Sequence, residues 1–209
     1  MRLVLASNNA KKLAELRLRL APLSLDLVTQ GSLGIAEADE PHHSFVENAL
    51  HKARHAARLA DAPAMADDSG LCVDALGGVP GVISANFANV VLLDAPREAQ
   101  RATQDAANNA LLIERLHGVA DRSARFVSTL VAVRSAADPE PLIATGRWHG
   151  EVLQASRGAG GFGYDPLLFI PGFGLTVAEL GADVKNAHSH RAMASRQMLS
   201  LMREVWGLG

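Results

Sequence analysis

Residues 2–20 read RLVLASNNAKKLAELRLRL, and within this stretch the spacing of the apolar residues changes. Residues 2–6 form a short apolar run, which is typical of a buried strand. Residues 7–9 are turn and N-cap types, and leucines then recur at helical spacing from Leu13 to Leu20. A strand, a turn and a helix in this order predict the first unit of an α/β fold.

Strands and helices continue to alternate along the chain. The expected strands cover residues 25–29, 64–66, 124–134, 141–154 and 167–170, and the expected helices cover residues 44–61, 99–116 and the segment after Ser189. Capping boxes are expected at Ser44 with Glu47 and at Thr176 with Glu179. Because βαβ units are mixed with a hairpin of the two long strands, we expect an α/β fold with a mixed β-sheet.

Length and composition limit the class of protein. The chain has 209 residues, 48% of them hydrophobic, and no linker rich in proline, glycine or serine, so we expect one domain over residues 1–209. Its 20 basic and 22 acidic residues give a formal net charge of -2, which argues against a nucleic-acid partner. No apolar run approaches membrane-spanning length, and Cys72 is the single cysteine. We therefore expect a cytoplasmic protein without a membrane partner.

A second informative segment, residues 158–166, reads GAGGFGYDP. Its glycines permit positive φ angles and the close approach of a ligand. Phe162 and Tyr164 supply flat rings, and Asp165 supplies a hydrogen-bond acceptor. This combination suits a planar ligand such as a nucleobase. A β-turn that leads into a buried strand is the alternative.

The turn at residues 7–9 has the features of a phosphate site. Backbone N–H groups and the positive end of the helix dipole converge where the strand gives way to the helix, and Lys12 adds a full charge. The sequence contains no G-x-x-x-x-G-K-[ST], so a P-loop nucleoside triphosphatase is not supported. An ordinary N-cap with solvated lysines is the alternative.

Asp67 and Asp68 are adjacent acids that we expect at the end of the short strand over residues 64–66. Neighbouring strand residues face opposite sides of a sheet, so at most one of the two carboxylates points into a given cleft. Mg²⁺ is usually held by one or two carboxylates together with substrate phosphates, and Glu40 is the natural second donor. Its rivals are Glu37, Asp39 and Glu47. The alternative is a turn whose aspartates bond their own backbone.

Residues 185–191 contain two cations and two histidines, and we expect this segment to end at the N-terminus of the last helix. Cations oppose the helix dipole at that end, which indicates an anionic ligand. A solvated polar helix start explains the same residues.

Together these segments resemble the noncanonical purine nucleoside triphosphate pyrophosphatases, the inosine/xanthosine triphosphatase or Ham1-like family. The matching pieces are residues 7–9 with Lys12 and Glu15, 45–49 with 52–54, 66–71, 76–81, 160–166 and 189–191. The resemblance implies an elongated, two-lobed α/β fold with a central substrate cleft, a homodimer and dependence on Mg²⁺. It further implies hydrolysis of ITP, dITP or XTP to the nucleoside monophosphate and pyrophosphate.

Roles for individual residues follow from the same resemblance. It implies that Asp68 is the catalytic base and that Glu40 and Asp68 are the metal-associated acids. The substrate-binding residues that it implies are Ser7, Asn8, Asn9 and Lys12 for the phosphates, Ser69 and Lys185 for the nucleotide, and Phe162, Gly163, Tyr164, Asp165, His190 and Arg191 for the base.

One region departs from the family pattern, and one other class of function remains open. Asn86 stands where relatives commonly carry arginine, and residues 89–100 do not follow the usual spacing, so the role of residues 86–100 is not predicted. The other class is a module that senses purine nucleotides without hydrolysing them. Paired acids argue against such a module, because a triphosphate binder gains little from extra negative charge unless a cation is present.

Overall fold

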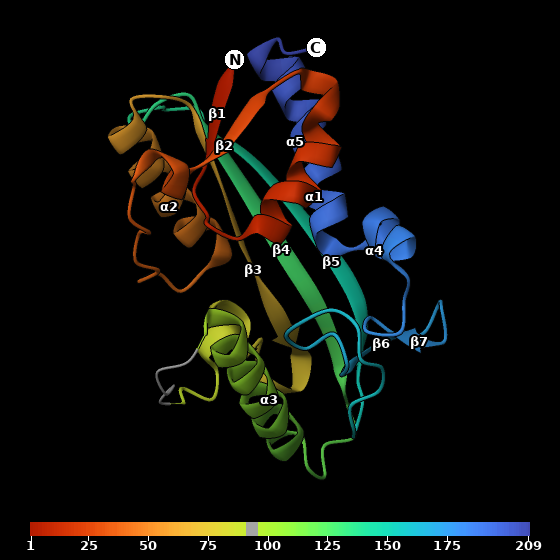
Figure 1. The fold of residues 1–209 in the computed structure, drawn as a ribbon. Helices are drawn as coiled ribbons and strands as arrows, with labels where there is room; N and C mark the ends of the chain where they lie inside the picture. The colour runs from red at the N-terminus through yellow and green to blue at the C-terminus, as the bar shows by residue number, and fades with distance from the viewer. Residues whose placement is uncertain (91–95) are drawn as a thin grey trace. The chain divides into compact units, whose positions relative to one another are not determined.

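The computed structural model describes residues 1–90 and 96–209 (Figure 1). The strands are β1 (Arg2–Leu5), β2 (Asp26–Thr29), β3 (Ala64–Val73), β4 (Ser123–Val133), β5 (Leu142–Val152), β6 (Leu168–Ile170) and β7 (Leu175–Thr176). The α-helices are α1 (Ala10–Leu20), α2 (Phe45–Ala60), α3 (Arg97–Arg115), α4 (Ala182–His188) and α5 (His190–Trp206).

The strands form one seven-stranded sheet in the order β2-β1-β3-β4-β5-β6-β7. β1 pairs in parallel with both β2 and β3, whereas β6 pairs antiparallel with β5 and with β7. The sheet is therefore mixed, and the predicted α/β class is confirmed.

Contacts divide the chain into two compact units. Unit 1 comprises residues 1–68, 128–147 and 188–209, and unit 2 comprises residues 69–127 and 148–187. The three strands β3, β4 and β5 each run from one unit into the other. A single domain over residues 1–209 stays a prediction.

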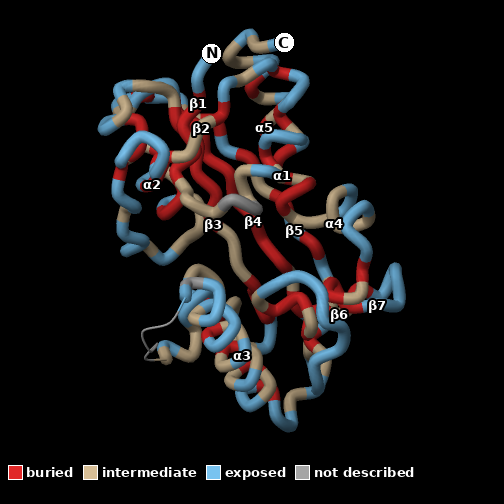
Figure 2. The backbone as a smooth tube through the Cα atoms, in the orientation of Figure 1, coloured by how far each residue is buried: buried red, intermediate tan, exposed pale blue. Residues whose placement is uncertain are grey.

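In unit 1 the alternation of side chains along each strand builds a separate core on each face of the sheet. Leu3 and Leu5 of β1 pack with residues of α1 and α5, whereas Val4 between them packs with alanines of α2. The same alternation places Leu130 of β4 in the first core and Val131 in the second. Because helices cover both faces, β1 and β4 are mostly buried (Figure 2), and residues 3–5 of β1 and 130–133 of β4 are continuous apolar runs.

The helix α2 is held close to the sheet by small side chains. Its alanines 49, 53, 56 and 57 are almost fully buried. The predicted N-cap is confirmed, because the side chain of Ser44 accepts a hydrogen bond from Glu47 N. The helix ends at Asp61, which has φ of 45°.

Two local predictions are wrong. The acids do not follow a short strand, because β3 continues through Asp67 and Asp68 to Val73. No helix begins at Thr176, which belongs to β7; the Glu179 carboxylate instead accepts from both Thr176 N and Oγ1. In both cases contacts with distant segments outweigh the local pattern. The prediction that residues 185–191 end at the N-terminus of the last helix is correct: Lys185 lies in the preceding helix α4, and Arg191 lies in the first turn of α5.

The region that departs from the family pattern is described only in part. Asn86 ends the 3₁₀ helix Gly81–Asn86 and is exposed, and α3 begins at Arg97. Residues 91–95, which belong to the same stretch, lie outside the described residues. The role of residues 86–100 therefore stays open.

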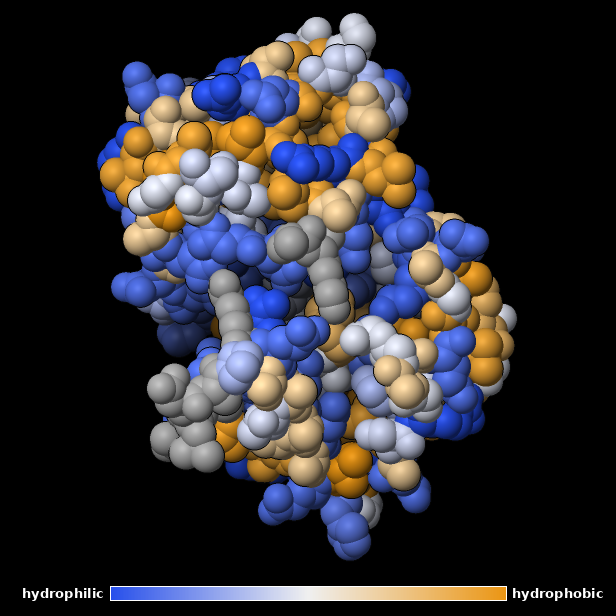
Figure 3. Space-filling model, in the orientation of Figure 1, coloured by the Kyte–Doolittle hydropathy of each residue, from blue (hydrophilic) through white to orange (hydrophobic). Residues whose placement is uncertain are grey.

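The surface is mixed in character. Hydrophilic and hydrophobic residues are interspersed on the face that Figure 3 shows. Within the described ranges, no helix has both the length and the apolarity that a membrane span requires.

Candidate active site

The two adjacent acids of β3 point to different partners, as the alternation of a strand requires. Asp67 contacts residues of α1, α5 and β4, whereas Asp68 contacts a lysine of α2. All of these partners belong to unit 1. The prediction that the two carboxylates occupy different environments is therefore correct, although they lie in mid-strand.

Asp67 is the centre of a buried ionic cluster. Its side chain is fully buried, and its Oδ2 lies 2.7 Å from Lys12 Nζ and 3.4 Å from Arg191 Nε. Ser128 Oγ donates to its Oδ1 at 2.7 Å. Burial opposes ionisation of this carboxyl, but Lys12 and Arg191 outweigh burial and hold its pKa well below the usual range. Asp67 is thus a permanently ionised link between β3 and two helices.

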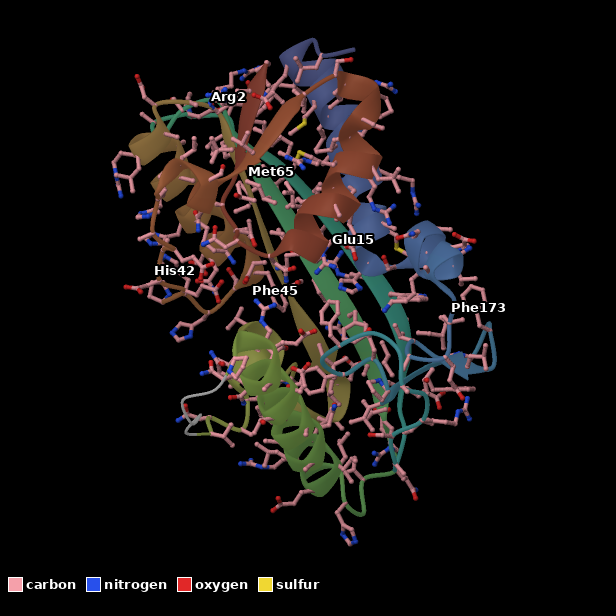
Figure 4. All side chains as sticks on the ribbon, in the orientation of Figure 1. Arg2, Glu15, His42, Phe45, Met65 and Phe173 are labelled. Carbon is pink, nitrogen blue, oxygen red and sulfur yellow. The ribbon has the colours of Figure 1, made fainter. Side chains whose placement is uncertain are left out.

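Arg191 is shared between two carboxylates. Its Nη1 also lies 3.0 Å from Glu15 Oε2, and Glu15 projects from α1 (Figure 4). The Arg191 side chain is only 6% exposed. Burial would lower its pKa, yet Asp67 and Glu15 together raise it above the ordinary value. The ionic cluster therefore joins α5 to α1 as well as to β3.

Asp68, Lys52 and Glu40 form a second cluster. Lys52 Nζ lies 2.9 Å from Asp68 Oδ1 and 2.6 Å from Glu40 Oε1, and it also donates to the backbone oxygen of Asp67 at 3.1 Å. Burial tends to lower the pKa of Lys52, but the two carboxylates raise it, so the proton stays on the amine. Lys52 thus binds Oδ1 of Asp68 and does not bind Oδ2 of the same carboxylate.

The second oxygen of Asp68 has unusual surroundings. Asp68 Oδ2 is buried and has no hydrogen-bond partner among the described residues. Burial raises the pKa of this carboxyl and Lys52 lowers it, but burial together with the charges of Glu40 and Asp67 leaves the pKa above its ordinary value. A carboxylate with a raised pKa and an unbonded oxygen has the properties of a general base.

The predicted phosphate residues cap α1. Asn9 Oδ1 accepts from Lys12 N at 3.2 Å, and Ser7 Oγ accepts from Asn9 N at 3.2 Å. Asn8 instead binds the 3₁₀ helix Gln30–Leu33, since its Oδ1 accepts from Gly31 N at 2.9 Å. The N-cap interpretation and the phosphate prediction are compatible, because the cap sits beside a cavity.

This cavity, of about 110 Å³, lies in unit 1 and is lined by residues of both clusters, the ionic cluster around Asp67 and the cluster of Asp68, Lys52 and Glu40. It brings together the predicted residues Ser7, Lys12 and Glu40, and its walls also include Lys52 and Asp67. The remaining lining residues are Ala6, Gln30, Glu37 and Ala38. A larger cavity of about 360 Å³ lies along α2 among His42, His51 and His55, and its lining includes Glu47, a rival of Glu40, but none of the residues predicted to bind the nucleotide.

The glycine-rich segment belongs to unit 2 and is held by Asp165. Asp165 Oδ2 accepts from Phe162 N at 3.1 Å and from Lys185 Nζ at 2.7 Å. A Cβ at Gly161 would lie 2.0 Å from the same oxygen, which explains the glycine at this position. Gly163 has φ of 60°, which favours glycine as well.

Of the two aromatic rings in this segment, Phe162 is the exposed one, at 49%. Lys185 Nζ lies 5.9 Å from its ring centroid. Tyr164 is buried, and its hydroxyl donates to the backbone oxygen of Ser84 at 2.8 Å. Burial, together with the charge of Asp105, raises the pKa of Tyr164. Phe162, Asp165 and Lys185 therefore form one group, and Tyr164 anchors it.

The other predicted nucleotide contacts lie in several places. Ser69 is half-buried in β3 and belongs to unit 2. His190 is half-buried at the start of α5, where Ser189 Oγ accepts from Ala192 N at 3.2 Å. Arg191 is committed to Asp67 and Glu15.

Sequence reasoning gave no role to three residues of these clusters, namely Glu15, Lys52 and Ser128. Lys52 had a detectable signal, because it interrupts the buried alanine face of α2. A lysine is almost never buried unless it is paired, so its position predicts a carboxylate partner. Glu15 and Ser128 had no such signal, since their partners are distant in sequence.

The predicted metal, Mg²⁺, fits the acids that are present. Oxygen ligands are what Mg²⁺ prefers, and one or two carboxylates suffice when substrate phosphates supply the rest. The unbonded Oδ2 of Asp68 and the half-exposed carboxylate of Glu40 meet that requirement. Within residues 1–90 and 96–209, no group of three or more histidine, cysteine or acidic side chains is arranged to hold a metal. Of the three rivals of Glu40, Glu47 is bonded to Ser44 in the cap of α2.

Comparisons with known proteins identify the family of this chain. The chain is 69% identical to a dITP/XTP pyrophosphatase of Methylibium petroleiphilum over 99% of both chains, and 65% identical to one of Leptothrix cholodnii over the full length of both. It is similar to the solved structure of a HAM1 protein from Coxiella burnetii, with a TM-score of 0.88 and 39% identity over 98% of this chain and all of the other. The profile of the Ham1 family matches residues 3–201, and the chain belongs to this family.

Proposed function

We propose that the protein hydrolyses noncanonical purine nucleoside triphosphates, namely dITP, XTP and ITP, to the nucleoside monophosphate and pyrophosphate. The observation that carries this proposal is the cluster of Asp68, Lys52 and Glu40 beside a cavity that Lys12 also lines. Relatives of nearly the same length are dITP/XTP pyrophosphatases, which supports the same reaction.

In the proposed reaction Asp68 is the base. Its Oδ2 accepts a proton from water, the water oxygen forms a bond to the α-phosphorus, and the bond from that phosphorus to the bridging oxygen of the β-phosphate breaks. Pyrophosphate leaves with the electron pair of that bond. Lys52 bonds Oδ1 of the same carboxylate and thereby fixes which oxygen meets the water. The raised pKa of Asp68 suits this role, because a base works best when its pKa approaches the working pH.

We propose Glu40 and Asp68 as the metal-associated acids: Glu40 would bind Mg²⁺ directly, and Asp68, whose Oδ2 meets the water, would lie beside it. When bound, Mg²⁺ supplies neutralisation of the charge that develops on the phosphate oxygens. Lys12 and the N-terminus of α1, with Ser7, Asn8 and Asn9, are proposed to bind the triphosphate. Lys12 has only 21% of its side chain exposed and keeps Asp67 as a partner, so its amine is already oriented.

We propose that the base is recognised in unit 2, where Phe162 offers a stacking face and Asp165 and Lys185 offer polar contacts. The roles predicted for Ser69, Gly163, Tyr164 and His190 stay proposals. A contact between Arg191 and the base is proposed as well, with the guanidinium also serving the carboxylates of Asp67 and Glu15. ATP should be a poor substrate, because its 6-amino group presents a donor where 6-keto purines present an acceptor.

Two further properties rest on the family resemblance and on composition. The homodimer is proposed from the resemblance to the Ham1 family. The cytoplasmic location is proposed from the single cysteine, Cys72.

The test is to incubate purified protein with ITP, XTP, dITP, GTP and ATP, with and without Mg²⁺, and to measure pyrophosphate and orthophosphate separately. We expect pyrophosphate from the first three nucleotides, only when Mg²⁺ is present, and a large loss of activity in Asp68→Asn. Release of orthophosphate alone would contradict the proposal. Tight nucleotide binding without any product would indicate a sensing module instead.

A further inference from the structure

Two polar side chains of α3 hold one glycine of the segment that we propose for the base. Asp105 Oδ2 accepts from Gly163 N at 2.7 Å, and Asn109 Nδ2 donates to Gly163 O at 2.9 Å. The two side chains are four residues apart and therefore lie on the same face of the helix. Both main-chain polar groups of Gly163 are thus bonded to α3, and all three residues belong to unit 2.

These two bonds fix the backbone on both sides of the glycine. The N–H of Gly163 belongs to the peptide plane that it shares with Phe162, and its C=O belongs to the plane that it shares with Tyr164. Glycine has the widest choice of backbone angles, so these planes would otherwise be the least determined in the segment. The first of these planes also borders Phe162, whose other peptide plane is held by the bond from Phe162 N to Asp165 Oδ2, so the backbone that directs the exposed Phe162 ring is fixed on both sides.

The stability of α3 alone does not explain these side chains. Aspartate and asparagine are poor helix formers in a helix interior, and both positions lie well inside Arg97–Arg115. Asn109 Oδ1 is also buried without a hydrogen-bond partner among the described residues, which is a cost to folding. Alanine or leucine would favour the helix at either position. What Asp105 and Asn109 provide, and alanine or leucine would not, is the pair of hydrogen bonds to Gly163.

We propose that Asp105 and Asn109 are positioning residues for purine selection, which act by fixing Gly163 and, through it, the ring of Phe162. This inference rests on the proposed function. Neither side chain touches the substrate. Their effect is on how well the protein distinguishes one base from another, and not on the bond-breaking step at Asp68.

The test uses two variants of the full chain. Asn109→Asp keeps the shape of the side chain but places an acceptor against Gly163 O, and Asp105→Ala removes the acceptor for Gly163 N. Each should raise the KM for dITP and XTP about two- to tenfold, the usual effect of one lost hydrogen bond. Each should also lower the ratio of kcat/KM for dITP to that for dGTP, while kcat for dITP changes less than about twofold.

Direct binding provides a second readout. In calorimetric titrations the affinity for dIMP should fall by the same factor as KM rises, whereas the affinity for pyrophosphate should stay at the wild-type value. Asp105→Asn keeps an acceptor oxygen and should restore most of the dITP-to-dGTP ratio. Thr103→Val is the matched control, because Thr103 is an exposed residue of α3 whose hydroxyl bonds only within the helix, at Ala99 O.

A wild-type KM and a wild-type dITP-to-dGTP ratio in Asn109→Asp would overturn the inference. A fall in kcat, melting temperature and pyrophosphate affinity at an unchanged ratio would also overturn it, because that pattern is a general loss of structure. Should Asp105→Ala not fold, Asn109→Asp decides the question alone. If the wild type releases no pyrophosphate, the proposed function itself is overturned. If the wild type turns over normally and the variants have the same KM and the same dITP-to-dGTP ratio, only the role of α3 is overturned.

Discussion

Replacing Asp67 by asparagine tests the buried ionic cluster most directly. The substitution keeps the shape of the side chain but leaves the charges of Lys12 and Arg191 without their shared partner. Removing one partner of a buried ion pair typically costs about 3 to 5 kcal/mol, because a charge remains buried and uncompensated. Glu15 still pairs with Arg191, so we expect Asp67→Asn to lower the unfolding free energy by about 3 kcal/mol, the lower end of that range.

The assay is denaturant and thermal unfolding at neutral pH, with a matched control. A loss of about 3 kcal/mol corresponds to a fall in melting temperature of roughly 6 to 12 °C for a chain of this size. Asp26→Asn is the control, since the Arg2–Asp26 pair has both side chains 59% exposed. Exposed pairs contribute about 0 to 1 kcal/mol. Equal, small losses in the two variants would refute the argument that burial makes the Asp67 cluster strong.

The pH dependence gives an independent check on the same cluster. The pKa of Asp67 is lowered in the folded protein, so its contribution is fully present above the unfolded-state pKa of about 3.9 and is lost as the pH falls toward the folded-state pKa. The difference in unfolding free energy between wild type and Asp67→Asn should therefore be constant from about pH 5 to 8 and shrink below about pH 4. A difference that varied strongly near neutral pH would point to another titrating group.

Three other substitutions test the proposed chemistry. Asp68→Asn should lower kcat at least about 100-fold, and its melting temperature should stay close to that of the wild type because the surroundings of Asp68 already disfavour the charged form. Steady-state kinetics measures the first effect and calorimetry the second. A larger loss of kcat in Asp67→Asn would reverse the assignment of the two acids. Lys12→Ala should weaken ITP binding by about 1.5 to 3 kcal/mol and IMP binding much less, and an equal loss for both ligands in calorimetric titration would place Lys12 away from the phosphate tail. Lys52→Met should raise the pKa of Asp68 and move the acidic limb of the kcat profile to higher pH, and an unmoved limb would show that Lys52 does not tune the base.

Local patterns predicted those features that depend on neighbouring residues. The cap of α2 at Ser44, the cap of α5 at Ser189 and the opposite orientation of Asp67 and Asp68 all follow from the side chain itself or from a two-residue period. The mixed sheet followed in the same way, since runs of apolar residues and their spacing are local properties as well.

Features that depend on distant partners were missed or misplaced. The polar residues at the centre of β3 were interpreted as the end of a strand because nothing adjacent in sequence satisfies them. Their partners are Arg191, 124 residues away, and Ser128, 61 residues away, and these bonds allow the strand to continue. The commitment of Arg191 to Asp67 and Glu15 was unpredictable for the same reason. The pair of side chains on α3 that holds Gly163 was missed for the same reason, because Gly163 lies 58 residues from Asp105 and 54 residues from Asn109.

The position of two unlike acids side by side on β3 also affects how this chain is aligned with others. An insertion or deletion of one residue ahead of Asp67 would turn every following side chain of the strand to the opposite face. Both carboxylates would survive such a change, yet each would lie where the other is needed. An alignment shifted by one column would likewise match the acid that links the helices with the acid proposed to activate water. In distant homologues, the lysine on the second helix is therefore a better guide to the reactive aspartate than the acidic pair itself.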